Sequence, residues 1–222
     1  KVMSREIYLG TEIPKNIDKI KEELEEEQKK ELADKLERIR NNFQSEWKKI
    51  PESVKQQEKE EIAIAFTYNT NAIEGSTITL AEAREIIHDK ISPRKPLKDV
   101  RETETHAKVF LSMLDEKSKI DVLVILKWHQ EIFGETKPDI AGKLRRYLVR
   151  VGSYVAPDWQ DVEKLMDEFI SFLKIQRTNP VEFAARAHYK FEKIHPFGDG
   201  NGRIGRLITN HILWHSGYPM II

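Results

Sequence analysis

Residues 195–206, His-Pro-Phe-Gly-Asp-Gly-Asn-Gly-Arg-Ile-Gly-Arg, bring together in one short segment the residue types that phosphate chemistry requires. The glycines at positions 198, 200 and 202 allow successive backbone N–H groups to converge on an anion. A helix that begins after them adds unpaired N–H groups and a partial positive charge. The segment therefore predicts a phosphate-binding loop between two helices.

The side chains of this segment have candidate roles. Arg203 and Arg206 lie three positions apart on the second helix, so we expect both guanidiniums to project from roughly one face and bind the oxygens of a polyphosphate. Asp199 is a candidate Mg²⁺ ligand, since Mg²⁺ favours one or two carboxylates together with phosphate oxygens. His195 is a candidate general base for an incoming hydroxyl. Each residue alone would more often be structural, but packing needs do not explain the combination, because glycines weaken helices.

Three other motifs are excluded. Gly200, Gly202 and Gly205 satisfy G-x-G-x-x-G, but a dinucleotide-binding fingerprint requires a preceding strand, and the preceding segment has helical character. A Walker A loop is excluded because no G-K-[ST] follows. His211 and His215 share a helical face, as zinc ligands would, but the glutamate of H-E-x-x-H is missing, so we interpret them as core or surface histidines.

Apolar spacing predicts helices around the loop. Steps of three and four over residues 16–50 indicate one or two charged helices on a solvated face, and the polar run at 25–31 argues against a sustained coiled coil. Further helices are expected over residues 53–73, 118–134, 159–177 and 183–194, and after the loop. Only residues 144–155 look extended, with turn chemistry at Gly152 and Ser153, and they predict one hairpin.

Capping signals mark where several helices should begin. They are Thr79 with Glu82, Ser118 with Asp121, and Asn179 followed by Pro180. Together with the apolar spacing they predict an all-α bundle that carries one small β element.

Composition limits the function classes. The 222 residues, 39% of them hydrophobic, suffice for a core, and 37 Lys and Arg balance 37 Asp and Glu, so no overall field attracts nucleic acid or a membrane surface. The absence of Cys excludes disulfides, thiol catalysis and Cys-ligated zinc, and no apolar run is long enough for a membrane span. We expect a cytoplasmic protein, and we expect this sequence, which begins at Lys1, to be a fragment of a longer one.

Residues 195–206 resemble the signature of Fic domains, H-P-F-x-[D/E]-G-N-G-R-x-x-R, with every fixed position present. The resemblance implies an all-α, Fic-type helical bundle with one small β-hairpin flap, preceded here by charged N-terminal helices. It divides the chain into a charged helical region (1–60), an inhibitory helix and its connection (61–96) and a Fic catalytic core (97–222).

The resemblance also implies an activity, the transfer of AMP from ATP to a Ser, Thr or Tyr hydroxyl of a protein target or of the chain itself. His195 would be the base that activates this hydroxyl, and Asp199 would hold Mg²⁺ against the α- and β-phosphates. Phe197 would be structural and pack the loop into the core.

The remaining residues of the motif would bind the nucleotide. Asn201, with the backbone of Gly200 and Gly202, would hold the α-phosphate and offset charge in the transition state. Arg203 would bind on the β-phosphate side, and Arg206 would bind the γ-phosphate.

The predicted hairpin resembles the family's flap, which aligns the target segment by strand addition. Its cations Lys143, Arg145, Arg146 and Arg150 are candidates for recognising an acidic partner, or simply protect a solvated edge. Relatives often pair through the Fic core, which makes a homodimer an expectation; no nucleic acid or membrane partner is indicated.

Residues 70–75, Thr-Asn-Ala-Ile-Glu-Gly, fit the inhibitory pattern [S/T]-x-x-x-E-[G/N] of Fic proteins and lie before the core. A Glu74 carboxylate paired with Arg206 would occupy the guanidinium that the γ-phosphate needs, with Thr70 bracing the pair by a hydrogen bond. The sequence thus predicts an autoinhibited adenylyltransferase. Three alternatives stay open: a deAMPylase in which Glu74 positions water, a nucleotide-regulated binding module without turnover, and another phosphate-containing donor.

Overall fold

Helices dominate the computed structural model, which describes residue 8 and residues 13–116, 119–175 and 179–222. In chain order they are α1 (Ile17–Lys49), α2 (Glu52–Ile73), α3 (Leu80–Arg84), a π-helical turn η1 (Glu85–Asp89), α4 (Leu97–Asp115), α5 (Val122–Phe133), a 3₁₀ turn η2 (Trp159–Asp161), α6 (Val162–Leu173), α7 (Pro180–Ile194) and α8 (Asn201–His215). Strands β1 (Arg150–Val151) and β2 (Tyr154–Val155) form a two-stranded antiparallel sheet. The prediction of an all-α bundle with one small β-hairpin is confirmed.

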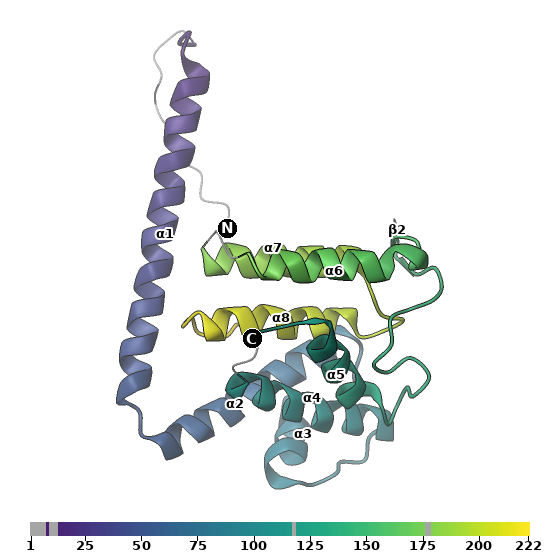
Figure 1. The fold of residues 1–222 in the computed structure, drawn as a ribbon. Helices are drawn as coiled ribbons and strands as arrows, with labels where there is room; N and C mark the ends of the chain where they lie inside the picture. The colour runs from purple at the N-terminus through teal and green to yellow at the C-terminus, as the bar shows by residue number, and fades with distance from the viewer. Residues whose placement is uncertain (1–7, 9–12, 117–118, 176–178) are drawn as a thin grey trace.

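Helix α8 lies at the centre of the bundle. In Figure 1, α6 and α7 lie on one side of it, and α2, α4 and α5 lie on the other. Ile204, Leu207 and Ile208 on α8 have no exposed surface. Helix α7 approaches α8 closely at Gly205, where an added Cβ would lie 2.9 Å from a carboxylate oxygen of Glu192 and 3.1 Å from the ring of His188. The loop that precedes α8 is therefore fixed to the most buried helix of the fold.

The charged N-terminal segment forms the single 33-residue helix α1, of which no residue is fully buried. Figure 1 shows its N-terminal part standing away from the bundle. Its C-terminal end is attached by aromatic contacts, since the rings of Phe43 and Trp47 lie 6.0 and 5.4 Å from the ring of Trp214 on α8. Helix α2 then continues across residues 60 and 61, where the sequence placed a domain boundary.

Helix starts follow the predicted capping signals with one difference. Thr79 and Glu82 form a complete capping box at α3, and the side chain of Asn179 accepts a hydrogen bond at the start of α7. At α5 the cap is Asp121, whose carboxylate accepts the N–H of Val124. Ser118, the other half of that signal, lies outside the described residues.

The predicted hairpin is shorter than residues 144–155. Arg150 pairs with Val155 and Val151 with Tyr154 around a turn at Gly152, where φ is +57°. Before β1 the chain instead lies against the glycine loop, where the N–H of Arg145 donates to the carbonyl of Pro196 over 2.9 Å. This segment is extended because it pairs with a loop and not with a second strand.

Among the helices of the described residues, none combines the length and the apolar character needed to cross a bilayer.

Candidate active site

The glycine loop joins α7 to α8 through two left-handed residues. His195 ends α7 with φ +50° and Gly200 precedes α8 with φ +80°. Such angles turn the chain sharply, so the loop reverses direction between two helices that pack side by side. His195 is thereby held at the beginning of the loop, and the first N–H groups of α8 lie at its end.

Asn201 and Phe197 close the loop on itself. The side-chain amide of Asn201 accepts the N–H of Phe197 and donates to its carbonyl, each over 2.9 Å. Phe197 has no exposed surface, as predicted from its place in the motif. The Asn201 side chain is therefore committed to the loop, and it leaves backbone N–H groups at the start of α8 to meet an anion.

Gly200→Ala is expected to destabilise the fold. An alanine would carry both the left-handed backbone angle and a Cβ that collides with the Phe133 ring. The angle costs about 1–2 kcal/mol and the overpacking about 1–3 kcal/mol. Gly152→Ala is the matched control, because φ is +57° there but nothing lies within 4 Å of the added Cβ. Urea unfolding should show a larger loss for Gly200→Ala; equal losses would contradict the proposed collision.

His129 on α5 packs against the glycine loop and forms a hydrogen bond with it, a role that sequence analysis missed. Its ring stacks on Phe197 at 3.9 Å between centroids. The N–H of Gly142 donates to Nδ1, so Nε2 carries the proton and donates to the carbonyl of Asp199 over 3.0 Å. Burial lowers the pKa of His129 to about 4, and the ring stays neutral in this position.

Acid should weaken the fold through His129. Its pKa is about 4 when folded against an ordinary 6.5, so between these values the unfolded chain gains a proton that the folded chain does not. Stability present above pH 6.5 should fall towards pH 4, by on the order of 3 kcal/mol at most from this residue. Urea unfolding at several pH values should show this slope, and His129→Asn should flatten it. An unchanged slope in the variant would show that another group causes the loss of stability in acid.

His195 has the environment of a neutral imidazole. Its side chain is 14% exposed, and Nδ1 lies 3.8 Å from a carboxylate oxygen of Glu192. Burial lowers the pKa of His195, and the charge of Glu192 opposes this shift only in part. The ring is thus unprotonated at neutral pH and suited to accept a proton, with Nε2 as the nitrogen that faces away from Glu192.

Arg145 forms hydrogen bonds with the backbone at His195 and at two other segments. Its guanidinium donates to the carbonyls of His195 at 2.8 Å, Tyr147 at 2.8 Å and Pro157 at 2.7 Å, and only 3% of the residue is exposed. The prediction that Arg145 recognises an acidic partner is therefore wrong, because its donors bind the chain's own carbonyls. Arg146 and Arg150 are exposed, as that prediction requires of them.

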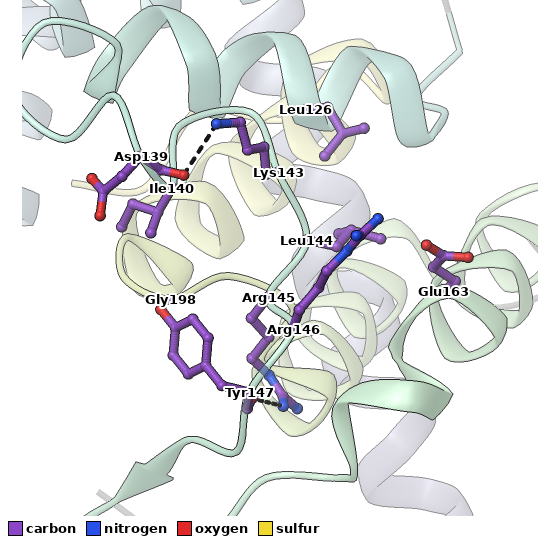
Figure 2. Close-up of a pocket in the computed structure, with 10 residues that line it drawn as sticks. All are labelled: Leu126, Asp139, Ile140, Lys143, Leu144, Arg145, Arg146, Tyr147, Glu163 and Gly198. Carbon is purple, nitrogen blue, oxygen red and sulfur yellow. Dashed lines mark hydrogen bonds between the residues drawn. The ribbon is translucent and has the colours of Figure 1, made fainter.

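A cavity of about 590 Å³ lies beside the loop, under the segment that leads into β1. In Figure 2 the phenol of Tyr147 points at Gly198 and Arg146 extends toward Glu163. A Cβ at residue 198 would collide with the Tyr147 hydroxyl, so the two segments approach closely only because residue 198 is glycine. The region predicted as a flap therefore lies directly against the glycine loop.

Asp199, which is partly exposed, and the buried Arg203 belong to one network of charges. Arg203, 4% exposed, pairs with Glu102 of α4 and lies 3.6 Å from Asp199. Lys137 lies 2.7 Å from Asp199 and 3.3 Å from Glu102. Burial would raise the pKa of each carboxyl group, but the neighbouring cations outweigh it and the pKa values of Asp199 and Glu102 are lowered. Both groups are ionised at neutral pH.

The two arginines of the motif were predicted to project from roughly one face, but they bind different partners. Arg203 points into the network on α4, whereas Arg206 points toward the end of α2. Glu102 and Lys137 were missed from sequence because they lie far from the motif along the chain and carry no local pattern.

Glu74 and Thr70 bind Arg206 as the inhibitory pattern predicts. Nη2 of Arg206 donates to Glu74 Oε1 over 2.6 Å, and Nε donates to the Thr70 hydroxyl over 2.5 Å. A Cβ on Gly202 would collide with the same carboxylate oxygen, so Glu74 lies directly over the first turn of α8. The carboxylate thus occupies the position where a helix N-terminus attracts an anion.

The residues present fit a Mg²⁺ ion shared with a nucleotide. Asp199 is 44% exposed and ionised, which suits the single carboxylate that Mg²⁺ takes beside phosphates and water. No group of three or more acidic or histidine side chains that could hold a metal without such help occurs among the residues described.

A model of the Fic/DOC family matches residues 119–213, a range that includes the whole glycine loop. This chain belongs to the Fic/DOC family. The Fic motif of the family is the loop described above, and Thr70, Glu74 and Glu102 lie before the matched range.

Two relatives named protein adenylyltransferase Fic illustrate the similarity. The one from Drosophila ananassae is 36% identical over 171 residues, which are 74% of this chain and 34% of the relative. The one from Nematostella vectensis is 37% identical over 163 residues, 70% of this chain and 38% of the relative. The chain spans about a third of the length of these Fic relatives.

Solved Fic structures share the fold. Fic-1 from C. elegans superposes with a TM-score of 0.71 at 29% identity, covering 87% of this chain and 60% of that one. A Fic domain containing signaling protein from Bacteroides thetaiotaomicron gives a TM-score of 0.70 at 27% identity, covering 83% of this chain and 76% of that one. Both superpositions cover more of this chain than the family match over residues 119–213.

Proposed function

We propose that this chain is an autoinhibited protein adenylyltransferase, which transfers AMP from ATP to a Ser, Thr or Tyr hydroxyl of a protein. The observation that carries the proposal is the Glu74 carboxylate, bound to Arg206 over 2.6 Å and placed over Gly202. A carboxylate there marks an anion site at the start of α8 and at the same time blocks it. The relatives named protein adenylyltransferase Fic support the same reaction.

In the proposed reaction the start of α8 binds the phosphates of ATP, and His195 accepts a proton. The triphosphate lies over the first N–H groups of α8, with the γ-phosphate on Arg206 once Glu74 has left it. The target hydroxyl gives its proton to Nε2 of His195, and its oxygen attacks the α-phosphorus. The bond from that phosphorus to the oxygen bridging to the β-phosphate breaks, and pyrophosphate leaves. AMP is then joined to the protein by a phosphodiester bond.

Charge in the transition state is offset by groups that are already fixed. The backbone N–H groups of Gly202 and its neighbours meet the α-phosphate, and Arg203 contributes positive charge from its buried site. Asp199 would hold Mg²⁺, which supplies neutralisation of phosphate charge when it is bound. Because Asn201 and His129 fix the loop beforehand, little reorganisation is needed.

The position of the label tests the reaction class. The Glu74→Gly variant, incubated with ATP labelled on the α-phosphate, should label protein, while ATP labelled on the γ-phosphate should not. Intact-mass measurement should show the addition of one AMP group per modified hydroxyl, on the chain itself or on added protein. Label from the γ-phosphate would reject AMP transfer in favour of phosphorylation, and no label from either would favour a binding module without turnover.

The reverse direction has one observation in its favour. The charge of Glu74 acts on His195, so the carboxylate lies within range of the reacting centre and is a candidate for positioning water. A protein already carrying AMP, incubated with the wild-type chain and with Glu74→Gln, separates the two directions. Faster release of AMP by the wild type would show that Glu74 serves deAMPylation, whereas equal rates would leave Glu74 an inhibitor only.

A further inference from the structure

Lys137 lies in the charged network beside the loop without belonging to the Fic motif. Its ammonium is 2.7 Å from Asp199 Oδ2 and 3.3 Å from Glu102 Oε1, and its side chain is 15% exposed. It also lies 4.9 Å from the centre of the Phe133 ring. Holding an ammonium in this position costs desolvation and side-chain entropy.

Stability alone is a weak reason for this arrangement. A buried ion pair contributes little net stability, since the loss of hydration offsets most of the attraction. Arg203 already pairs with Glu102, so Lys137 is not needed as its only counter-ion. The ammonium is instead the partner of Asp199, the carboxylate that faces the proposed phosphate site.

A cavity of about 90 Å³ connects these groups to the anion position. Lys137, Asp199 and Arg203 line it from one side, and Glu74 and Asn71 line it from the other. The cavity therefore places the ammonium of Lys137 next to Glu74, the carboxylate that lies over the anion position.

We propose that Lys137 is a phosphate-binding residue of this chain. Its ammonium occupies the position beside the Asp199 carboxylate where a divalent cation would otherwise bind. The inference rests on the proposed function and adds to it. When a triphosphate replaces Glu74, the ammonium is within the same cavity and meets the phosphate oxygens. The site then binds ATP without a divalent cation, and Lys137 and Mg²⁺ compete for one carboxylate oxygen.

Calorimetric titration with ATP tests this binding directly. In the Glu74→Gly background, ATP should bind both in EDTA and in saturating Mg²⁺. Adding Lys137→Met should weaken binding in EDTA at least about tenfold, the effect of one charge-assisted hydrogen bond. The loss in Mg²⁺ should be smaller, and the Mg²⁺ concentration for half-maximal binding should fall, because the competing ammonium is gone.

Two further variants complete the test. Lys137→Arg keeps the positive charge and should restore binding in EDTA to within about threefold. Lys127→Met is the matched control, since Lys127 lies on the neighbouring α5 with its side chain 58% exposed, and it should change nothing.

The outcomes separate this inference from the proposed function. If Glu74→Gly binds ATP in Mg²⁺ but not in EDTA, or if Lys137→Met binds in EDTA as tightly as its parent, the role of Lys137 is overturned and the proposed function stands. If no variant binds ATP under any condition, both fall. The EDTA comparison of the parent needs no Lys137 variant, so failure of the parent to bind ATP in EDTA overturns the inference even if Lys137→Met does not fold.

Discussion

Replacing Glu74 by glycine is expected to raise AMP transfer by about 10- to 100-fold. The substitution removes the carboxylate that binds Arg206 and lies over Gly202, so the γ-phosphate no longer competes for the guanidinium. A hydrogen bond between charged groups contributes about 1.5–3 kcal/mol, which corresponds to this range. The gain should appear as a lower KM for ATP and a higher rate of labelling from α-labelled ATP.

Two controls show whether the effect belongs to the site. Glu74→Gln keeps the size of the side chain and loses its charge, so its rate should lie between wild type and Glu74→Gly. Glu61 lies on α2, the helix that Glu74 caps, and also pairs with an arginine, Arg84, but its side chain is 50% exposed. Glu61→Gln should leave labelling unchanged. Equal rates for wild type and Glu74→Gly would remove the case for autoinhibition.

Replacing His195 by alanine in the Glu74→Gly background is expected to lower kcat by about 10²- to 10⁴-fold, the usual contribution of a general base. ATP affinity should change little, because the phosphates are bound by α8 and the arginines and not by the imidazole. His88→Ala is the control, since the His88 side chain is 55% exposed and lies 3.3 Å from Glu60, outside the groups that line the glycine loop. Labelling measured with saturating ATP separates the two effects.

The pH profile gives an independent measure of the same role. Burial lowers the pKa of His195, so the imidazole stays unprotonated further into the acid range than a free one. The kcat/KM of Glu74→Gly should therefore fall on the acid side at a pH below the ordinary titration of histidine. A fall above that range, or a profile that His195→Ala leaves intact, would assign proton transfer to another group.

Local signals in the sequence were enough to predict much of this site. The three glycines and the residues around them indicated a phosphate loop, and the structure gives this loop two left-handed residues, His195 and Gly200. The inhibitory pattern linked Glu74 to Arg206 across 132 positions, and the pair forms. The helix caps at Thr79 and Asn179 could be predicted from the sequence, because a cap and its partner lie within three residues.

The parts that were missed depend on contacts between distant segments. Arg145 looked like an exposed hairpin cation, but it binds carbonyls at the end of α7, some 50 positions away. His129 and Lys137 had no motif of their own, and their roles follow only from contact with Asp199. The hairpin was overestimated because alternating apolar residues indicate an extended chain without telling what it pairs with.

In the proposed off state, the Glu74 carboxylate that binds Arg206 is part of the same folded chain as the site that it covers. A tethered group has an effective concentration fixed by the fold, so dilution of the protein does not release it. Under the proposed mechanism ATP competes with Glu74 within each molecule, and its apparent affinity is lowered because only the open fraction of molecules can bind it. We therefore expect the ATP concentration needed for activity to be the same in a dilute and in a concentrated sample of the protein.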